Sequence, residues 1–141
     1  MSAHLHHYDL PETLPVGPGD LALDCEAMGL RPHRDRLCVL QLSDGQGDAH
    51  LVHFPTPDFR APNLKRLLAE PGRTMLFHFA RFDVALIQHY LGVRLTHVYC
   101  TRTASRLVRT YTDRHGLREV CRELLGVEIS KQQQSSYWGT E

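Results

Sequence analysis

Hydrophobic and polar residues alternate in short runs along the first part of the chain, after a lead-in rich in proline and glycine. The runs cover residues 21–25, 37–42 and 50–54, and the segment Asp44-Gly45-Gln46-Gly47 before the third run is typical of a turn. Alternation of this kind indicates strands with one buried face. Because consecutive strands joined by short turns pair side by side, the pattern predicts an antiparallel meander.

The hydrophobic period then lengthens to that of helices. We expect strands at residues 74–79 and 97–100. We expect helices at residues 63–70, 81–91, 103–110 and 117–125. Pro62 precedes the first helix, and Gly92 and Gly126 follow the second and fourth, as helix boundaries favour. A meander followed by alternating strands and helices predicts an α/β fold with helices packed on a mixed sheet. We expect one domain over residues 1–141.

Composition narrows the class of protein. The 141 residues are 42% hydrophobic, and no apolar run approaches the roughly 18 residues that span a bilayer. The first residues lack the apolar core of a secretion signal, so we expect a cytoplasmic protein with no membrane partner. The four cysteines lie far apart without a CxxC pair, which favours reduced thiols over disulfides or zinc. The histidines at positions 4, 6 and 7 lack a fourth ligand and predict at most weak metal binding.

Acidic and basic residues are unevenly distributed, although the net charge is zero. Residues 1–60 hold nine acids and four arginines, whereas residues 61–141 hold twelve basic residues and seven acids. Arg102, Arg106 and Arg109 have the i, i+4, i+7 spacing that places them on one face of a helix. The forked arginine head suits phosphate, so this face is a candidate for binding nucleic acid. A solvated helix face is the alternative interpretation.

Two carboxylates stand at the end of the first expected strand, in Leu21-Ala22-Leu23-Asp24-Cys25-Glu26. The period-two alternation of a strand directs Asp24 and Glu26 to the same face. Two like charges at one place repel each other and are costly to desolvate, and a divalent cation such as Mg²⁺ or Mn²⁺ offsets both effects. The alternative is that the strand ends here and both carboxylates are solvated.

A third carboxylate, Asp83, falls in the first turn of the helix expected at 81–91, just past the strand expected at 74–79. That strand could lie beside the first, which would bring Asp83 toward Asp24 and Glu26. An acid in the first turn of a helix is also an ordinary partner of the helix dipole, and this interpretation stays open.

Three blocks of the sequence together resemble the DEDD 3′–5′ exonucleases. They are Asp24-x-Glu26 followed by Met28-Gly29-Leu30, then His78-x3-Phe82-Asp83, then residues 110–117 with the sequence TYTDRHGL. Within that family the chain is most similar to the ribonuclease D branch and its short alphaproteobacterial members, called ribonuclease D or nano-RNase C. The similarity runs from about residue 10 to residue 138.

The resemblance implies a ribonuclease H-like fold with a five-stranded mixed sheet flanked by helices. It implies a metal-dependent exoribonuclease that holds two divalent cations, Mg²⁺ or Mn²⁺, on Asp24, Glu26 and Asp83, and releases nucleoside 5′-monophosphates. The implied partners are short RNA or RNA 3′ ends, with DNA left open, and further copies of the chain in a homo-oligomer. The candidate substrate-binding residues are Met28, Leu30, His78, Phe82, Arg106 and Arg109.

The family's third motif, Tyr-x3-Asp on a late helix, is absent. Ser136-Tyr137-Trp138 matches the segment that precedes it in relatives, and the chain ends three residues later. Tyr137 and Glu141 have the spacing, but a glycine interrupts them, so we interpret the match as chance. The sequence therefore predicts an exonuclease domain incomplete at its C-terminus and of reduced activity. The alternative is a catalytically impaired, nuclease-like module that binds nucleic acid or a partner.

Overall fold

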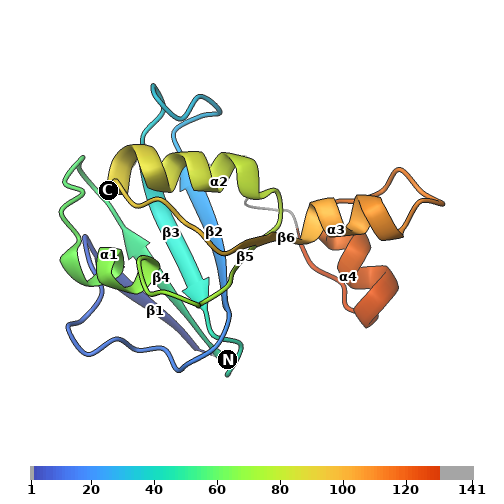
Figure 1. Cartoon of the computed structure of the whole chain (residues 1–141), viewed down its shortest axis with the longest axis horizontal. Coiled ribbons are helices and arrows are strands. Elements are labelled where there is room, and N and C mark those ends of the chain that lie inside the picture. The colour runs from blue at the N-terminus through green and yellow to red at the C-terminus, as the bar shows by residue number, and fades with distance from the viewer. Residues whose placement is uncertain (1, 131–141) are drawn as a thin grey trace.

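A mixed β-sheet of six strands, in the order β1-β4-β3-β2-β5-β6, forms the body of the molecule (Figure 1). The computed structural model describes residues 2–130. The strands are β1 (Ser2–His7), β2 (Leu21–Ala27), β3 (Leu37–Ser43), β4 (Asp48–His53), β5 (Met75–Phe77) and β6 (Val98–Cys100). Strands β2, β3 and β4 pair antiparallel, which confirms the predicted meander. The pairs β1–β4, β2–β5 and β5–β6 are parallel.

The α/β class and the mixed sheet are confirmed, but the sheet has six strands rather than the predicted five. The additional strand is β1, which pairs in register with β4 from Ser2 opposite Asp48 to His7 opposite His53. Nearly all of its side chains are exposed, so no hydrophobic alternation marks it in the sequence. Backbone hydrogen bonds to β4 hold strand β1 in the sheet. A side-chain hydrogen bond of 3.2 Å between the imidazole rings of His6 and His50 adds to them.

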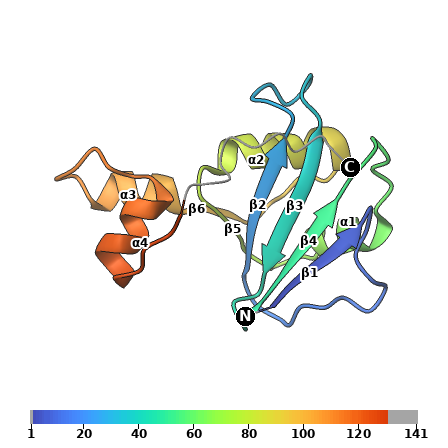
Figure 2. The same ribbon diagram turned by 180° about the vertical axis from the view of Figure 1, so that it is seen from behind.

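Helices α1 (Pro62–Leu68) and α2 (Ala80–Leu86) cover one face of the sheet, as Figures 1 and 2 show from opposite sides. Their buried leucines, among them Leu64, Leu67 and Leu86, join the side chains of β2 and β3 in the core. A π-helical turn (Ile87–Leu91) continues α2. The helix predicted at 81–91 is therefore present, and its last five residues are π-helical. It ends at Gly92, whose φ of 68° favours glycine.

Helices α3 (Thr101–Val108) and α4 (Leu117–Leu125) pair with each other beyond the edge strand β6, away from the central strands (Figure 1). Helix α4 has the predicted bounds, whereas α3 begins and ends two residues earlier than expected. Large apolar side chains of this pair are exposed: Leu107, Val108, Leu117, Leu124 and Leu125.

Two expectations from composition can be compared with the structure. All four cysteines are free, as predicted for reduced thiols, and Cys25 and Cys38 are buried in the sheet. Within residues 2–130, none of the helices has both the length and the apolar character needed to cross a membrane.

Candidate active site

Asp24 and Glu26 lie on the face of β2 opposite to its buried residues, as the alternation predicts. Leu21, Leu23 and Cys25 are buried, whereas Asp24 is exposed and Glu26 is partly exposed. The pairing register between β2 and β3 shifts between Glu26 and the next residue, a bulge that locally redirects the end of the strand. The chain therefore places both carboxylates where a regular ladder gives way to a loop.

Asp83 lies in the first turn of α2 and is 4% exposed. Burial, followed by the negative charges of Asp24 and Glu26, raises the pKa of Asp83 to about 8, although a hydrogen bond from the Cys25 amide acts in the opposite direction. The fold thus brings the three predicted carboxylates into electrostatic contact, from a strand and a helix far apart in the sequence. We call Asp24, Glu26 and Asp83 the acidic centre.

The other two members of the acidic centre also resist ionisation. Burial, followed by the charge of Asp24, raises the pKa of Glu26 to about 7. Although the residue as a whole is exposed, partial desolvation of its carboxyl group raises the pKa of Asp24 as well, and the 3.3 Å hydrogen bond that Gln41 Nε2 donates to the carboxylate offsets part of this rise. Gln41 lies opposite Asp24 in the register of β3 and had no signal in the sequence.

The acidic centre has negative charge without a compensating cation from the protein. In the described part of the chain, none of the three carboxylates takes part in an ion pair. Repelling, partly buried carboxylates are the oxygen donor set that a divalent cation neutralises. Over residues 2–130, however, no three side chains of His, Cys, Asp or Glu are already gathered around one position that could hold an ion. The donor chemistry therefore fits a divalent cation, whereas the arrangement is not a closed cage.

His78, directly after β5, connects the sheet to the α3–α4 pair. Its Nε2 donates to the backbone carbonyl of His115 at 2.7 Å, and its Nδ1 lies 2.8 Å from Thr101 Oγ1. Burial lowers the pKa of His78, and the charge of Arg102 lowers it further. The protein therefore engages both ring nitrogens of this candidate substrate-binding residue.

The three apolar candidates for substrate binding, Met28, Leu30 and Phe82, differ in their exposure to solvent. Met28 and Leu30, in the loop after β2, are 40% and 86% exposed. Phe82 instead is partly buried and packs against the hydrophobic core. Of these three candidates, Met28 and Leu30 therefore present apolar surface of the kind expected of substrate contacts.

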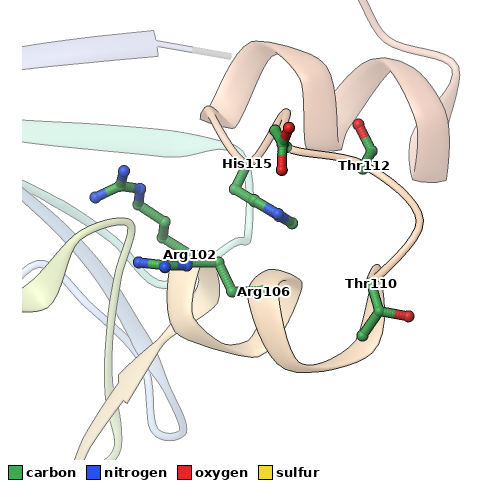
Figure 3. Close-up of a pocket in the computed structure, with 6 residues that line it drawn as sticks. Arg102, Arg106, Thr110, Thr112 and His115 are labelled. Atoms are coloured by element: carbon green, nitrogen blue, oxygen red, sulfur yellow. The ribbon is translucent and has the colours of Figure 1, made fainter.

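The predicted arginine face is only partly present. Arg106 and Arg102 extend from α3 along a cavity of about 450 Å³, which is also lined by Thr110, Thr112, Asp113 and His115 (Figure 3). Arg109 does not share this face: it is 5% exposed, and its guanidinium donates to Glu123 on α4, to Ser105 Oγ and to the Arg114 carbonyl. Arg109 is the C-cap residue of α3, and its amide still donates to the Ser105 carbonyl at 2.7 Å, so these side-chain partners, rather than a loss of helical spacing, withdraw it from the face.

The third motif cannot be located in the structure, since Tyr137, Trp138 and Glu141 lie outside the described residues. One residue of the second sequence block, Phe79, was not among the candidates. Phe79 is an exposed aromatic between His78 and α2, and Arg102 lies over its ring, with 4.9 Å from the guanidinium carbon to the ring centroid. Arg102 stood out in the sequence through its spacing from Arg106, whereas Phe79 had no signal beyond its place in the second block.

Comparison with known proteins places these features among nucleases. A family model described as 3′–5′ exonuclease matches residues 9–141. The structure of Brucella melitensis NrnC bound to pGG is 48% identical in sequence, with a TM-score of 0.94, over 100% of this chain and 68% of that chain. The structure of Brucella melitensis NrnC with bound Mg²⁺ is 47% identical, with a TM-score of 0.93 and the same coverage.

Curated relatives match at lower identity. Ribonuclease D from Gluconacetobacter diazotrophicus is 27% identical over 118 residues, which are 84% of this chain and 30% of that protein. Protein RRP6-like 1 from Arabidopsis thaliana is 25% identical over 119 residues, which are 84% of this chain and 18% of that protein. The chain therefore spans less than a third of the length of these two proteins.

Proposed function

Because the chain belongs to the 3′–5′ exonuclease family, in the branch that includes ribonuclease D and NrnC, we propose that it is a metal-dependent exoribonuclease. It removes nucleoside 5′-monophosphates from short RNA or RNA 3′ ends by phosphodiester hydrolysis. The observation that carries this proposal is the electrostatic coupling of the three carboxyl groups: the charge of Asp24 raises the pKa of both Glu26 and Asp83, and the charge of Glu26 raises that of Asp83.

The acidic centre would hold the cofactor, two divalent cations, Mg²⁺ or Mn²⁺. Asp24 would be shared between the two positions, Glu26 would serve the one near the attacking water, and Asp83 would serve the other. Such ions supply a water molecule of lowered pKa and stabilise the negative charge of the leaving 3′ oxygen. The Mg²⁺ bound in one NrnC structure supports this choice of ion.

The pKa values of the carboxyl groups determine how the binding of divalent cations depends on pH. With pKa values near 7 and 8, Glu26 is about half protonated and Asp83 mostly protonated at neutral pH when no cation is bound. These protons must leave before the oxygens can coordinate a metal ion, so cation binding strengthens as the pH rises. The cation also compensates for repulsion that the protein itself leaves uncompensated.

The surroundings of the acidic centre would hold the substrate. Exposed Met28 and Leu30 offer an apolar edge against which unstacked bases can pack. Arg106 and Arg102 present guanidinium groups along the cavity between α3 and the segment before α4 (Figure 3), where a phosphate would be attracted. The pGG in one NrnC structure supports a short nucleotide substrate.

We further propose that residues 1–141 form a single exonuclease domain that acts on RNA in the cytoplasm, with its activity on DNA left open, and that it assembles into homo-oligomers. Comparing RNA with DNA oligomers of one sequence tests the activity on each, and light scattering at several protein concentrations tests the assembly.

The central test uses the purified chain, Mg²⁺ or Mn²⁺, and RNA of two to seven nucleotides labelled at its 5′ end. We expect stepwise release of nucleoside 5′-monophosphates from the 3′ end, reduced by about 100-fold or more in Asp24→Ala and Asp83→Ala. Asp20→Ala is the matched control, because Asp20 is an exposed carboxylate just before β2 and outside the acidic centre. Release that is unaffected by the two substitutions overturns the assignment of the acidic centre.

A second candidate function is a nuclease-like module that binds nucleic acid without cleaving it. The observation in its favour is that no three metal-ligating side chains are already gathered around one position within residues 2–130. Retention of labelled RNA by the wild-type chain with no product, in Mg²⁺ and in Mn²⁺, would establish this second function in place of the first.

A further inference from the structure

Phe79 combines two unfavourable features at one position, four residues before Asp83 of the acidic centre. It is an aromatic residue that is 46% exposed, and its backbone has a φ of 75°, in the left-handed region that favours glycine. It directly follows His78 and immediately precedes α2, whose first turn carries Asp83. Strained backbone at a non-glycine residue persists where the surroundings enforce it, and such residues gather at ligand sites.

The backbone amide of Phe79 donates a hydrogen bond to the Cys100 sulfur, but the structural roles open to the Phe79 side chain do not account for its exposure. It precedes the helix, but no side-chain hydrogen bond caps α2 there, and a phenyl ring has no group that could form one. It is not among the apolar residues that pack on the core, in contrast to Phe82 in the same segment. The exposed part of the ring therefore remains available to a ligand.

The environment of the ring points to the chemistry of that ligand. The Arg102 guanidinium carbon lies 4.9 Å from the ring centroid, a cation–π contact that holds the ring from the α3 side. Arg102 also lines the cavity that holds Arg106 (Figure 3), so a flat apolar surface adjoins a basic one. An exposed ring beside clustered arginines is the combination that binds the bases and the phosphates of single-stranded nucleic acid.

We propose that Phe79 is the stacking platform for a nucleobase next to the scissile phosphate, with Arg102 fixing the ring and attracting the adjoining phosphate. This inference deepens the proposed function, on which it rests, by naming a substrate-positioning residue and the part of the substrate it contacts. Stacking on a phenyl ring is tolerant of base identity, so the site selects unpaired nucleotides rather than a sequence.

The test uses 5′-phosphorylated RNA dinucleotides that carry 2-aminopurine at either position, since stacking on an aromatic ring quenches its fluorescence. Binding to the wild-type chain is expected to quench one of the two probes. Phe79→Ala is expected to abolish that quenching and to weaken binding by roughly 5- to 150-fold. In turnover experiments KM is expected to rise more than kcat falls, and Phe79→Trp is expected to restore both quenching and KM.

Two further variants separate stacking from folding. Phe79→Asn suits the left-handed backbone, because asparagine tolerates this region better than phenylalanine, yet it cannot stack. It should fold with a Tm close to that of the wild type and bind as weakly as Phe79→Ala. Leu5→Ala removes an exposed apolar side chain from β1, at the opposite edge of the sheet, and should bind like the wild type.

The outcomes distinguish this inference from the proposed function. If the wild type quenches a probe but does not cleave RNA, the proposed hydrolysis fails and the stacking site stands. If the wild type cleaves RNA while Phe79→Ala and Phe79→Asn keep wild-type dissociation constants and quenching, the stacking site is overturned and the nuclease stands. Equal binding by the Ala and Trp variants also overturns it.

Discussion

The carboxylate of Asp83 on α2 lies within electrostatic reach of the carboxylate of Asp24 on β2, and the charge on Asp24 raises the pKa of Asp83 beyond the effect of burial. This relationship connects the start of α2, which follows β5, with the end of β2. When no cation is bound, repulsion within the acidic centre destabilises the folded protein. Several measurable properties depend on this destabilisation.

The free energy of unfolding should fall with increasing pH when no metal is present. The pKa of Asp83 is about 8 in the folded chain, above its ordinary value of 3.8, so the folded state binds the additional proton between these pH values. The stability associated with the protonated form is complete below the lower value and is lost as the pH rises toward 8. Asp83→Asn should be more stable than the wild type at pH 8 by a few kcal/mol, at ~1.4 kcal/mol per pKa unit.

Urea denaturation in EDTA at pH 5 and pH 8 measures this effect. The difference between Asp83→Asn and the wild type should be larger at pH 8 than at pH 5. The control is Asp20→Asn, which changes an exposed carboxylate. A pH dependence that is identical in wild type and Asp83→Asn would contradict the role of this carboxyl.

Mg²⁺ should stabilise the chain, and more strongly at higher pH. A cation that binds the folded state alone raises Tm, and the Glu26 and Asp83 carboxyls must lose protons to bind it. Thermal melts with and without 10 mM Mg²⁺ should therefore show a larger shift at pH 8.5 than at pH 6.5, of a few °C. Asp24→Asn should remove the shift, and an equal shift in that variant would place the ion elsewhere.

Arg109 and Arg106 should have different functions despite their similar sequence context. Arg109 is buried and joins the end of α3 to Glu123 on α4, so Arg109→Ala should lower Tm by about 5 °C. Arg106 is exposed along the cavity, so Arg106→Ala should leave Tm nearly unchanged. Differential scanning calorimetry compares the two variants, and equal losses of Tm would contradict the structural difference between them.

Arg106→Ala should weaken RNA binding through loss of a phosphate contact. Dissociation constants measured between 50 and 300 mM KCl should show a plot of log K against log salt that is shallower by about one unit. A weaker affinity with an unchanged salt slope would mean that Arg106 does not contact phosphate.

Cys100 should be the most readily alkylated thiol of the native chain. Burial opposes ionisation, but hydrogen bonds from Thr103 and from the Ala80 amide outweigh it and lower the pKa of Cys100 to about 7. Iodoacetamide labelling followed by mass spectrometry should give a rate at Cys100 that rises with pH, with a midpoint near 7. Buried Cys25, whose thiol pKa is raised by burial, should react only in urea. A midpoint above 8 at Cys100 would contradict the prediction.

The elements that the sequence predicted are those whose pattern is local. Helix α4 has the predicted bounds, and the strand expected at 21–25 begins at Leu21 and extends to Ala27. Strand β1 escaped prediction because an exposed edge strand needs no hydrophobic alternation. The end of α3 at Val108 was also missed. The prediction for Arg109 failed for another reason, because its ion pair with Glu123 on α4 is a tertiary contact that helical spacing does not show.

The sequence by itself determined the α/β class, the meander and the common face of Asp24 and Glu26, because strand and helix periods follow from backbone geometry within a few residues. Only the tertiary structure decided that Asp83 adjoins Asp24, that Arg109 binds Glu123 and that Phe79 lies exposed under Arg102. These relationships depend on distances through space between separate elements. Burial and charge act over those distances, and no local spacing encodes them.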